Sequence, residues 1–424
     1  MSINALKNSK LIASVISASF LLSGCVGDSD DSNSTDFSAA ETQNMIVNIT
    51  DNVIIPNLNA AQSAANDLAS DTGDLAAYCQ AIGTAAEDST LNSAKQSWAN
   101  TMDAWQRAQL SFVLPVSDSN NNAELVRKVL AYAENSITPC AIDRRVVIVQ
   151  NDGFNADQLQ NNFRGLDAID YLLFNTDLDH QCTSTDAETV ALMNTWDAQT
   201  DTDKKIWRCE LALHLAGDIS GAVQQFSTQW ADDGDNFRSK FINPSNEHLA
   251  IEALSDAIFF LDTTLKDIKI GYTLNLAGNC PGTNGLEACP TRVESRFSNR
   301  SLENVKTNLE AFLELYKGKD GQGFDDYIIA KGHPDIAQEF IDETQAAIDH
   351  IDTIEGTLSD EVARIVTTDD AAACTNAAAN PDSPSDFPSC ALFGLVKRVT
   401  DDLKDRFVAI VEVEIPDRAQ SDND

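Results

Sequence analysis

The chain has 424 residues, of which 43% are hydrophobic and 7% aromatic, so it is long enough for two domains with their own cores. Its formal net charge of −37 argues against nucleic acid as a partner and against electrostatic docking on anionic lipid. Cationic partners are compatible with this charge, although solubility alone explains it more simply. Short β-branched runs and abundant Ala, Leu, Asp, Asn and Gln predict a mostly helical fold.

Residues 1–24 have the pattern of a signal peptide, because two lysines are their only charges and the apolar run at 11–22 is short for a membrane span. Residues 22–25, Leu-Ser-Gly-Cys, resemble a bacterial lipobox, in which the cysteine is acylated and becomes the mature N-terminus. We therefore expect Cys25 to anchor the protein in an envelope membrane, facing the periplasm or the cell surface. The following Val26 favours the outer membrane.

Residues 25–40 are rich in Asp, Ser and Asn and predict a flexible acidic tether. A helix over 41–68 follows, in which Pro56 should cause a kink or a break. The clearest helix has an approximate heptad stripe that includes Trp98, Met102 and Trp105 and ends before Pro115. Gln109 occupies a position of that stripe. Residues 122–132 allow a shorter helix, and 146–149 a short extended piece.

Two acids interrupt the apolar pattern of residues 162–175. On a helix, Asp167 and Asp170 fall inside the apolar arc rather than opposite it. The pattern extends back to an N-cap at Asn155, which would leave both carboxylates far from the positive end of the helix dipole. Buried carboxylates are costly without partners, so a cation or a hydrogen-bond donor should meet them. Gly165 indicates close approach of another backbone at this point.

The polar stretch 180–203 marks a domain junction. Beyond it, helical periodicity returns in several long segments that are separated by loops at 271–291 and 371–389. These predicted helices cover residues 204–230, 246–270, 301–316, 335–354 and 390–413. We therefore predict an all-α fold of two helical bundles, at 41–200 and 201–415, followed by a disordered tail at 416–424.

Residues 165–170, Gly-Leu-Asp-Ala-Ile-Asp, resemble the Gly-x-His-x-x-Glu signature of the imelysin-like proteins, bacterial envelope proteins first described as peptidases and often linked to iron uptake. Asp167 stands in the place of the signature histidine and Asp170 in that of the glutamate. Residues 105–108, Trp-Gln-Arg-Ala, and residues 293–298 are similar to further segments of the family. The resemblance covers about residues 41–415 and implies paired helical bundles and iron-uptake components as partners.

Eight cysteines remain after Cys25, and an even number in an exported chain favours disulfides. No Cys-x-x-Cys occurs, which argues against zinc ribbons and thioredoxin-type chemistry. Sequence leaves the connectivity open. Chain order and loop placement favour the simplest pairing, which is Cys79 with Cys140, Cys182 with Cys209, Cys280 with Cys289, and Cys374 with Cys390.

We expect the inward polar groups of neighbouring helices to meet in one cleft, since that is the simplest way to satisfy them. The candidate site contains Asp167, Asp170 and Gln109, with Arg107, Arg164 and Tyr171 close by and Glu294 or Ser298 approaching from the second half. Oxygen ligands suit iron, calcium or another hard cation better than zinc. If an arginine, Tyr171 or a lysine of the other bundle satisfies the carboxylates instead, the pair is structural.

Three functions therefore remain open. The favoured one is a non-catalytic binding lipoprotein associated with iron or another cation. The second is a metallopeptidase of the imelysin type, and the third is a structural or adhesive surface lipoprotein. The missing signature histidine argues against the peptidase, because a catalytic zinc normally has three protein ligands with histidine among them.

Overall fold

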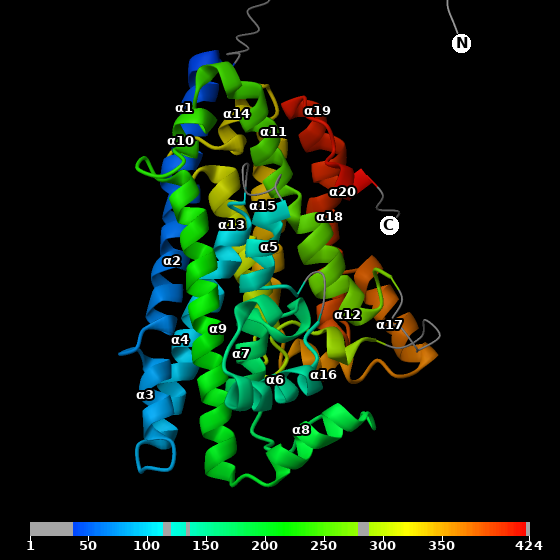
Figure 1. Cartoon of the computed structure of the whole chain (residues 1–424). Coiled ribbons are helices and arrows are strands. Elements are labelled where there is room, and N and C mark those ends of the chain that lie inside the picture. The colour runs from blue at the N-terminus through cyan, green and yellow to red at the C-terminus, as the bar shows by residue number, and fades with distance from the viewer. Residues whose placement is uncertain (1–36, 113–119, 133–135, 279–287, 421–424) are drawn as a thin grey trace, which may run out of the picture. The chain divides into compact units, whose positions relative to one another are not determined.

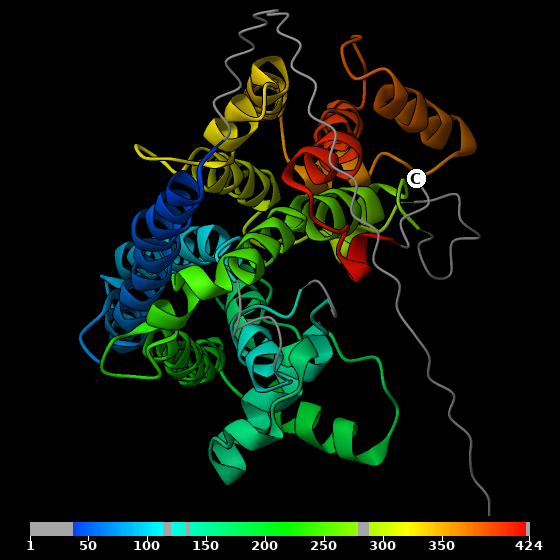
Figure 2. The same cartoon turned by 90° about the horizontal axis from the view of Figure 1, so that it is seen from above.

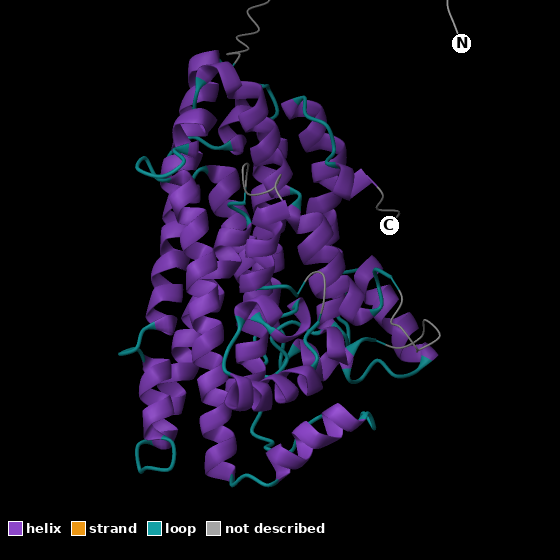
Figure 3. Ribbon diagram, viewed as in Figure 1, coloured by secondary structure: helices purple, strands orange, loops and turns teal. Residues whose placement is uncertain are grey.

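The structure, a computed structural model, describes residues 37–112, 120–132, 136–278 and 288–420. The predicted signal peptide (1–24), Cys25 and all but the end of the tether (25–40) lie outside the described residues. Every element among the described residues is a helix, and none is a strand (Figure 3). This confirms the predicted all-α class.

In the described part of the chain, eight α-helices precede residue 200 and twelve follow it (Figure 1). The first group is α1 (Ala39–Ile49), α2 (Ile55–Ala69), α3 (Asp74–Ala81), α4 (Glu87–Gln109), α5 (Asn120–Val129), α6 (Pro139–Asp152), α7 (Gly165–Phe174) and α8 (Ala187–Asp197). The second is α9 (Asp201–Trp230), α10 (Phe237–Phe241), α11 (Glu247–Ile258), α12 (Tyr272–Leu274), α13 (Ser301–Lys317), α14 (Phe324–Ala330), α15 (Pro334–Ile351), α16 (Leu358–Val362), α17 (Thr368–Ala379), α18 (Pro388–Asp402), α19 (Val408–Val411) and α20 (Asp417–Gln420).

Wider and tighter helical turns join these helices. The π-helical segments are η1 (Thr50–Ile54), η5 (Leu261–Gly271) and η7 (Leu403–Phe407), and the 3₁₀ turns are η2 (Ala156–Gln158), η3 (Asn161–Phe163), η4 (Pro244–Asn246) and η6 (Pro290–Arg292). Pro56 lies in the first turn of α2, directly after η1. A proline removes one N–H donor, and the π-helical turns before it let the chain continue from α1 into α2.

The long helices pack against one another around a single apolar cluster. Helix α9 packs against α2, α3, α5, α6 and α7, and α4 packs against α2, α3, α7 and α13. In the second half, α15 packs against α13, α14 and α18. Helix α9 thus joins the helices that precede it in the chain, and the division into bundles at residue 200 stays a prediction.

Two segments differ from their predicted conformation. Residues 146–149 are not extended but belong to α6, where Val146, Val147 and Val149 are buried, so helix packing overrides the β-preference of valine. Within the predicted loop 371–389 lies most of α17, which starts with a capping box between Thr367 and Asp370. Figure 2 shows α17, in orange, at the edge of the fold beside α18.

Two of the observed disulfides differ from the predicted pairs. Cys79 is bonded to Cys209 and Cys140 to Cys182, with Cα–Cα distances of 5.6 and 4.5 Å. The predicted pairs Cys79–Cys140 and Cys182–Cys209 are therefore wrong. Helix α3 packs against α9 and brings Cys79 next to a cysteine more than a hundred residues away in the chain. The pair Cys374–Cys390 is confirmed and joins α17 to α18. Cys289 is also disulfide-bonded, whereas Cys280 lies outside the described residues.

Disulfides persist in oxidising compartments, so their presence indicates a protein that functions outside the reducing cytoplasm. Among the described residues, no helix has both the length and the apolar character needed to cross a membrane.

Candidate functional site

Helix α7 presents both aspartates, but it starts later than predicted. Asn155 caps only the short turn η2, and α7 begins at Gly165. Gly165 has φ +74°, and a Cβ there would lie 2.6 Å from the carbonyl oxygen of Val129. The glycine thus permits the expected close approach and ends the preceding loop. Asp167 consequently lies in the first turn, near the positive end of the helix dipole and not far from it.

Asp167 is buried without a direct partner. Its side chain is 5% exposed, and no described residue forms a hydrogen bond or ion pair with its carboxylate. Burial, together with the charges of Glu294 and Asp170, raises the pKa of Asp167 well above its usual range. The cations Lys269 and Arg296 oppose this rise without cancelling it.

Asp170 is held by two consecutive backbone amides. The N–H of Phe297 donates to one carboxylate oxygen at 3.1 Å and the N–H of Ser298 donates to the other at 3.0 Å. Burial outweighs these hydrogen bonds and raises the pKa of Asp170 to about 7. The loop that supplies the amides contains two non-glycine residues with left-handed backbone, Ser295 (φ +48°) and Asn299 (φ +60°). Such strain often occurs at functional sites.

Glu294, from the same loop, accepts from two buried side-chain amides. Gln106 Nε2 of α4 donates to its Oε1 at 3.0 Å, and Asn304 Nδ2 of α13 donates to its Oε2 at 3.1 Å. Lys269 Nζ of η5 lies 3.2 Å from Glu294 Oε1 and also donates to Asn308 Oδ1 at 2.8 Å. Lys269 is 2% exposed, so burial lowers its pKa although Glu294 and Asp167 raise it.

The structure brings four predicted site residues together, namely Asp167, Asp170, Glu294 and Ser298. Gln109 reaches only the edge, where its Oε1 lies 3.4 Å from Lys269 Nζ. The other three predicted neighbours bind elsewhere: Arg107 pairs with Glu310 and Glu314, Arg164 pairs with Glu124 and Asp218, and the Tyr171 hydroxyl donates to Asp143. None of these three therefore satisfies the two aspartates.

Sequence reasoning missed several residues that complete the site. They are Gln106, Lys269, Asn304, Asn308, Tyr132 and Arg296. Gln106 could have been found, because it follows Trp98 and Met102 at intervals of four residues and so lies on the same helix face. Lys269 gave no such signal, since a lysine in an amphipathic helix normally marks its exposed face.

A cavity of about 10 Å³ adjoins the two aspartates. Its lining comes from several segments: Tyr132, Ser136, Ile137, Asp167, Asp170, Thr291, Val293, Ser295 and Arg296. This volume is about that of one water molecule or one dehydrated ion. With every group ionised, Asp167, Asp170 and Glu294 exceed the charge of Lys269 and Arg296 by one, so the site can take up a proton or a cation.

A second group of acids lies outside this site, on α15 and α18. Carboxylate oxygens of Glu339, Glu343 and Asp402 lie within 4.8 Å of one another. Arg406 already binds two of them, with a 2.7 Å ion pair to Glu339 and a closer one to Asp402. Burial and the charges of both neighbours raise the pKa of Glu343 to about 7.

Comparison with family models identifies one family. The imelysin family model matches residues 58–381, more than half of the chain. The chain is similar to the crystal structure of an imelysin-like protein from Psychrobacter arcticum, with a TM-score of 0.63 and 11% identity over 90% of this chain and 98% of the other. It is also similar to a protein from Parabacteroides distasonis named as an iron-regulated protein A precursor, with a TM-score of 0.53 and 14% identity over 86% and 96% of the two chains. None of the curated proteins matches.

Proposed function

Because the chain belongs to the imelysin family, we propose that it is a non-catalytic cation-binding protein, anchored to a membrane of the bacterial envelope and serving iron uptake. The observation that carries this proposal is the carboxylate of Asp167, which is buried and has no hydrogen-bond partner among the described residues. A buried carboxylate in this state is either protonated or needs a cation.

The donor set favours a hard cation. Around the cavity the polar side chains are carboxylates and hydroxyls together with the guanidinium of Arg296, without histidine or cysteine among the described lining residues. Oxygen-only sites suit calcium, manganese or ferric iron. The Parabacteroides protein is named as iron-regulated, which associates that protein with iron. Asp167 and Asp170 would hold the ion, and the lining supplies hydroxyl groups from Tyr132, Ser136, Thr291 and Ser295.

The size of the cavity favours binding over hydrolysis. About 10 Å³ accepts one ion but not a peptide bond with its flanking residues. Lys269 and Arg296 reduce the negative charge that a multivalent ion would find, so an ion has to replace a proton to be compensated. Since the pKa of Asp167 is raised, cation binding should release a proton, and affinity should increase with pH.

Thermal unfolding with added metals tests the cation site. We expect ferric iron, supplied as its nitrilotriacetate complex, or calcium or manganese to raise the Tm of the native protein by several degrees, because a ligand of the folded state stabilises it. Asp167→Asn should abolish the response, whereas Glu343→Gln in the outer group of acids should keep it. A native protein that responds to none of the metals, with a destabilised Asp167→Asn variant, would instead support a structural role.

Anchoring rests on the lipobox-like residues 22–25 and on the disulfides, which require an oxidising compartment. Several acyl chains on one cysteine bind a membrane stably, unlike a single chain. Cys25→Ala should therefore move the protein from the membrane fraction to the soluble fraction. If the variant still fractionates wholly with membranes, the anchor lies elsewhere.

A further inference from the structure

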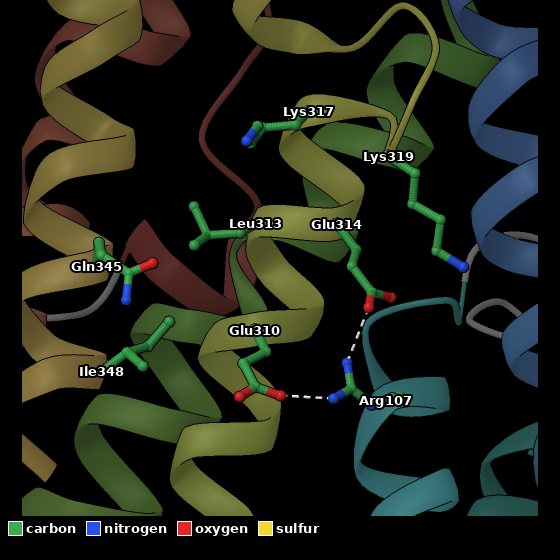
Figure 4. A pocket seen from close by; sticks show the side chains of 8 residues that line it. All are labelled: Arg107, Glu310, Leu313, Glu314, Lys317, Lys319, Gln345 and Ile348. Atoms are coloured by element: carbon green, nitrogen blue, oxygen red, sulfur yellow. Dashed lines mark hydrogen bonds and ion pairs between the residues drawn. The ribbon is translucent and has the colours of Figure 1, made fainter. Parts of the chain in front are cut away.

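A second pocket, of about 330 Å³, shares no lining residue with the aspartate cavity (Figure 4). Its walls come from α4, α13, the turn after α13, and α15. Its volume falls in the range of small-molecule sites, roughly 300–1,000 Å³. From its charge and shape we propose that this pocket binds a small organic anion with two or three carboxylates.

Each acid of the pocket already forms one ion pair with Arg107, although Glu314 Oε2 has no hydrogen-bond partner among the described residues. Arg107 of α4 lies between Glu310 and Glu314 of α13, with ion pairs of 2.5 and 2.9 Å (Figure 4). The two glutamates restrain the guanidinium from two directions and compensate its charge. A ligand with free ammonium groups would have to compete with Arg107 for these carboxylates, so the pocket does not favour a cation.

The free charges of the pocket are cationic. Lys317 and Lys319 line it, and no described residue forms an ion pair or a hydrogen bond with either ammonium group. Lys317 lies in the last turn of α13, where the helix dipole favours a cation even without a ligand. The helix dipole does not explain a lysine at position 319, because Lys319 lies beyond the end of α13. Its backbone is left-handed (φ +55°), a conformation that costs energy for any residue but glycine.

The turn that holds Lys319 is fixed to the rest of the protein. Asn48 Nδ2 of α1 donates to the carbonyl oxygens of Gly318 and Gln322, both at 2.8 Å. Gly318 and Gly323 leave no room for a Cβ, since one would lie 2.2 and 2.3 Å from neighbouring backbone atoms. The lysine is thus presented from a rigid turn, and less entropy is lost when a ligand binds.

The remaining walls suit a carbon skeleton. Leu313 of α13 and Ile348 of α15 supply aliphatic surface on the side of α13 toward which Lys317 extends, and Lys319 extends on the opposite side of α13 (Figure 4). A small polycarboxylate would place its carboxylates on Lys317 and Lys319 and its methylene groups against these side chains. The chain carries a net charge of −37, so an anion is repelled everywhere except where cations are left unpaired. Salt screens the attraction to the lysines and the repulsion by the rest of the chain alike.

Isothermal titration calorimetry with tricarballylate at low ionic strength tests the proposal. This tricarboxylate lacks the hydroxyl with which citrate chelates metals, so its binding does not report on contaminating metal. We expect Lys319→Gln to weaken binding by about fivefold and Lys317→Gln/Lys319→Gln by at least about tenfold, since each removes a charge contact. Lys240→Gln on α10 makes the same charge change at an exposed site and should leave binding unchanged.

Three results would overturn the proposal. One is that native protein releases no heat of binding with millimolar tricarballylate, and another is that Lys319→Gln binds no more weakly than Lys240→Gln. The third is that inorganic phosphate competes as well as the tricarboxylate, because the pocket would then recognise charge without the carbon skeleton. Asp167→Asn should bind tricarballylate like the native protein, which separates this pocket from the proposed cation site.

Discussion

Each of two groups of carboxylates in this protein contains one member with a pKa raised to about 7, Asp170 in the inner group and Glu343 in the outer group, but the groups differ in what surrounds them. In the inner group, Asp170 and Asp167 are at most 5% exposed, and the nearest buried cation, Lys269, is bound to Glu294. In the outer group, Glu343 lies beside Glu339 and Asp402, and Arg406, whose side chain is 33% exposed, bridges the last two. Nearness of carboxylates alone therefore does not distinguish a candidate cation site from a solvated ion-pair network.

The difference lies in which charges remain unpaired and how much water reaches them. Water reaches the side chains of Glu339 and Asp402 and screens their ion pairs, so breaking one of these pairs has little effect on stability, although Glu343 Oε2 is buried without a hydrogen-bond partner. In the inner group, water is excluded, and each unpaired charge costs several times more. The following variants use this contrast, from the largest expected effect to the smallest.

Loss of the inner cation should give the largest effect. Lys269→Met keeps most of the side-chain volume but leaves Glu294 and the oxygen of Asn308 without their ammonium partner. We expect unfolding free energy, measured in urea at pH 8, to fall by about 3 kcal/mol or more. At pH 5 the loss should be smaller, because protonation of the carboxylates removes part of the repulsion.

The matched change in the outer group is Arg406→Met. It removes two ion pairs and about the same side-chain volume, yet water can solvate Glu339 and Asp402 afterwards. The expected loss is below about 1 kcal/mol at pH 8. If Arg406→Met were as destabilising as Lys269→Met, the contrast between a buried and a solvated network would be wrong.

The sequence predicted the inner group in part. Asp167 and Asp170 were recognisable because a period of 3.6 residues turns them toward the core, and residues 293–298 because of the family resemblance. Gln109 was chosen from its heptad position, yet Gln106, three residues earlier, bonds to Glu294. The choice between them depends on how α4 rotates against α13, which is set by packing and not by the pattern of one helix.

Packing between distant segments also explains why other features could not be predicted. The start of α7 depends on the positive φ of Gly165, which a helical pattern does not reveal. Lys269 is buried only because η5 places it between α4 and α13, next to an acid from a distant loop. The pairs Cys79–Cys209 and Cys140–Cys182 follow from the contacts of α3 and α6, so chain order was the wrong guide. Individual helices follow from the local sequence, whereas these features depend on tertiary contacts.

A further prediction concerns the pH dependence of stability. A carboxyl group with a raised pKa in the folded state stabilises the fold below its unfolded pKa of about 4, and this contribution is lost as pH rises through the folded pKa. The pKa of Asp170 in the folded state is about 7, so its contribution is lost by about that pH. The pKa of Asp167 is shifted in the same direction. Unfolding free energy of the native protein should therefore fall between pH 5 and pH 8.

Asp167→Asn removes the contribution of Asp167 to this pH dependence, because asparagine resembles the protonated carboxyl and does not ionise when the chain unfolds. The decline measured by urea unfolding should become shallower by up to about 1.4 kcal/mol per pH unit. Asp349→Asn, at an exposed position of α15, is the control and should leave the slope unchanged. An unchanged slope in Asp167→Asn would mean that Asp167 ionises normally in the folded protein.

The smallest effect is expected for Glu343→Gln in the outer group. The pKa of Glu343 is raised to about 7 as well, with the same sign of linkage, so its stabilising contribution is also lost between about pH 4 and pH 7. However, Glu343 is only partly buried, and Arg398 and Arg406 lower its pKa from two sides. Solvent screening should reduce the change in slope to a few tenths of a kcal/mol per pH unit, measured by the same urea series. If Glu343→Gln flattened the pH dependence as much as Asp167→Asn, the outer carboxylates would hold their proton as firmly as the inner ones, and burial would no longer single out Asp167 as the place where a cation replaces a proton.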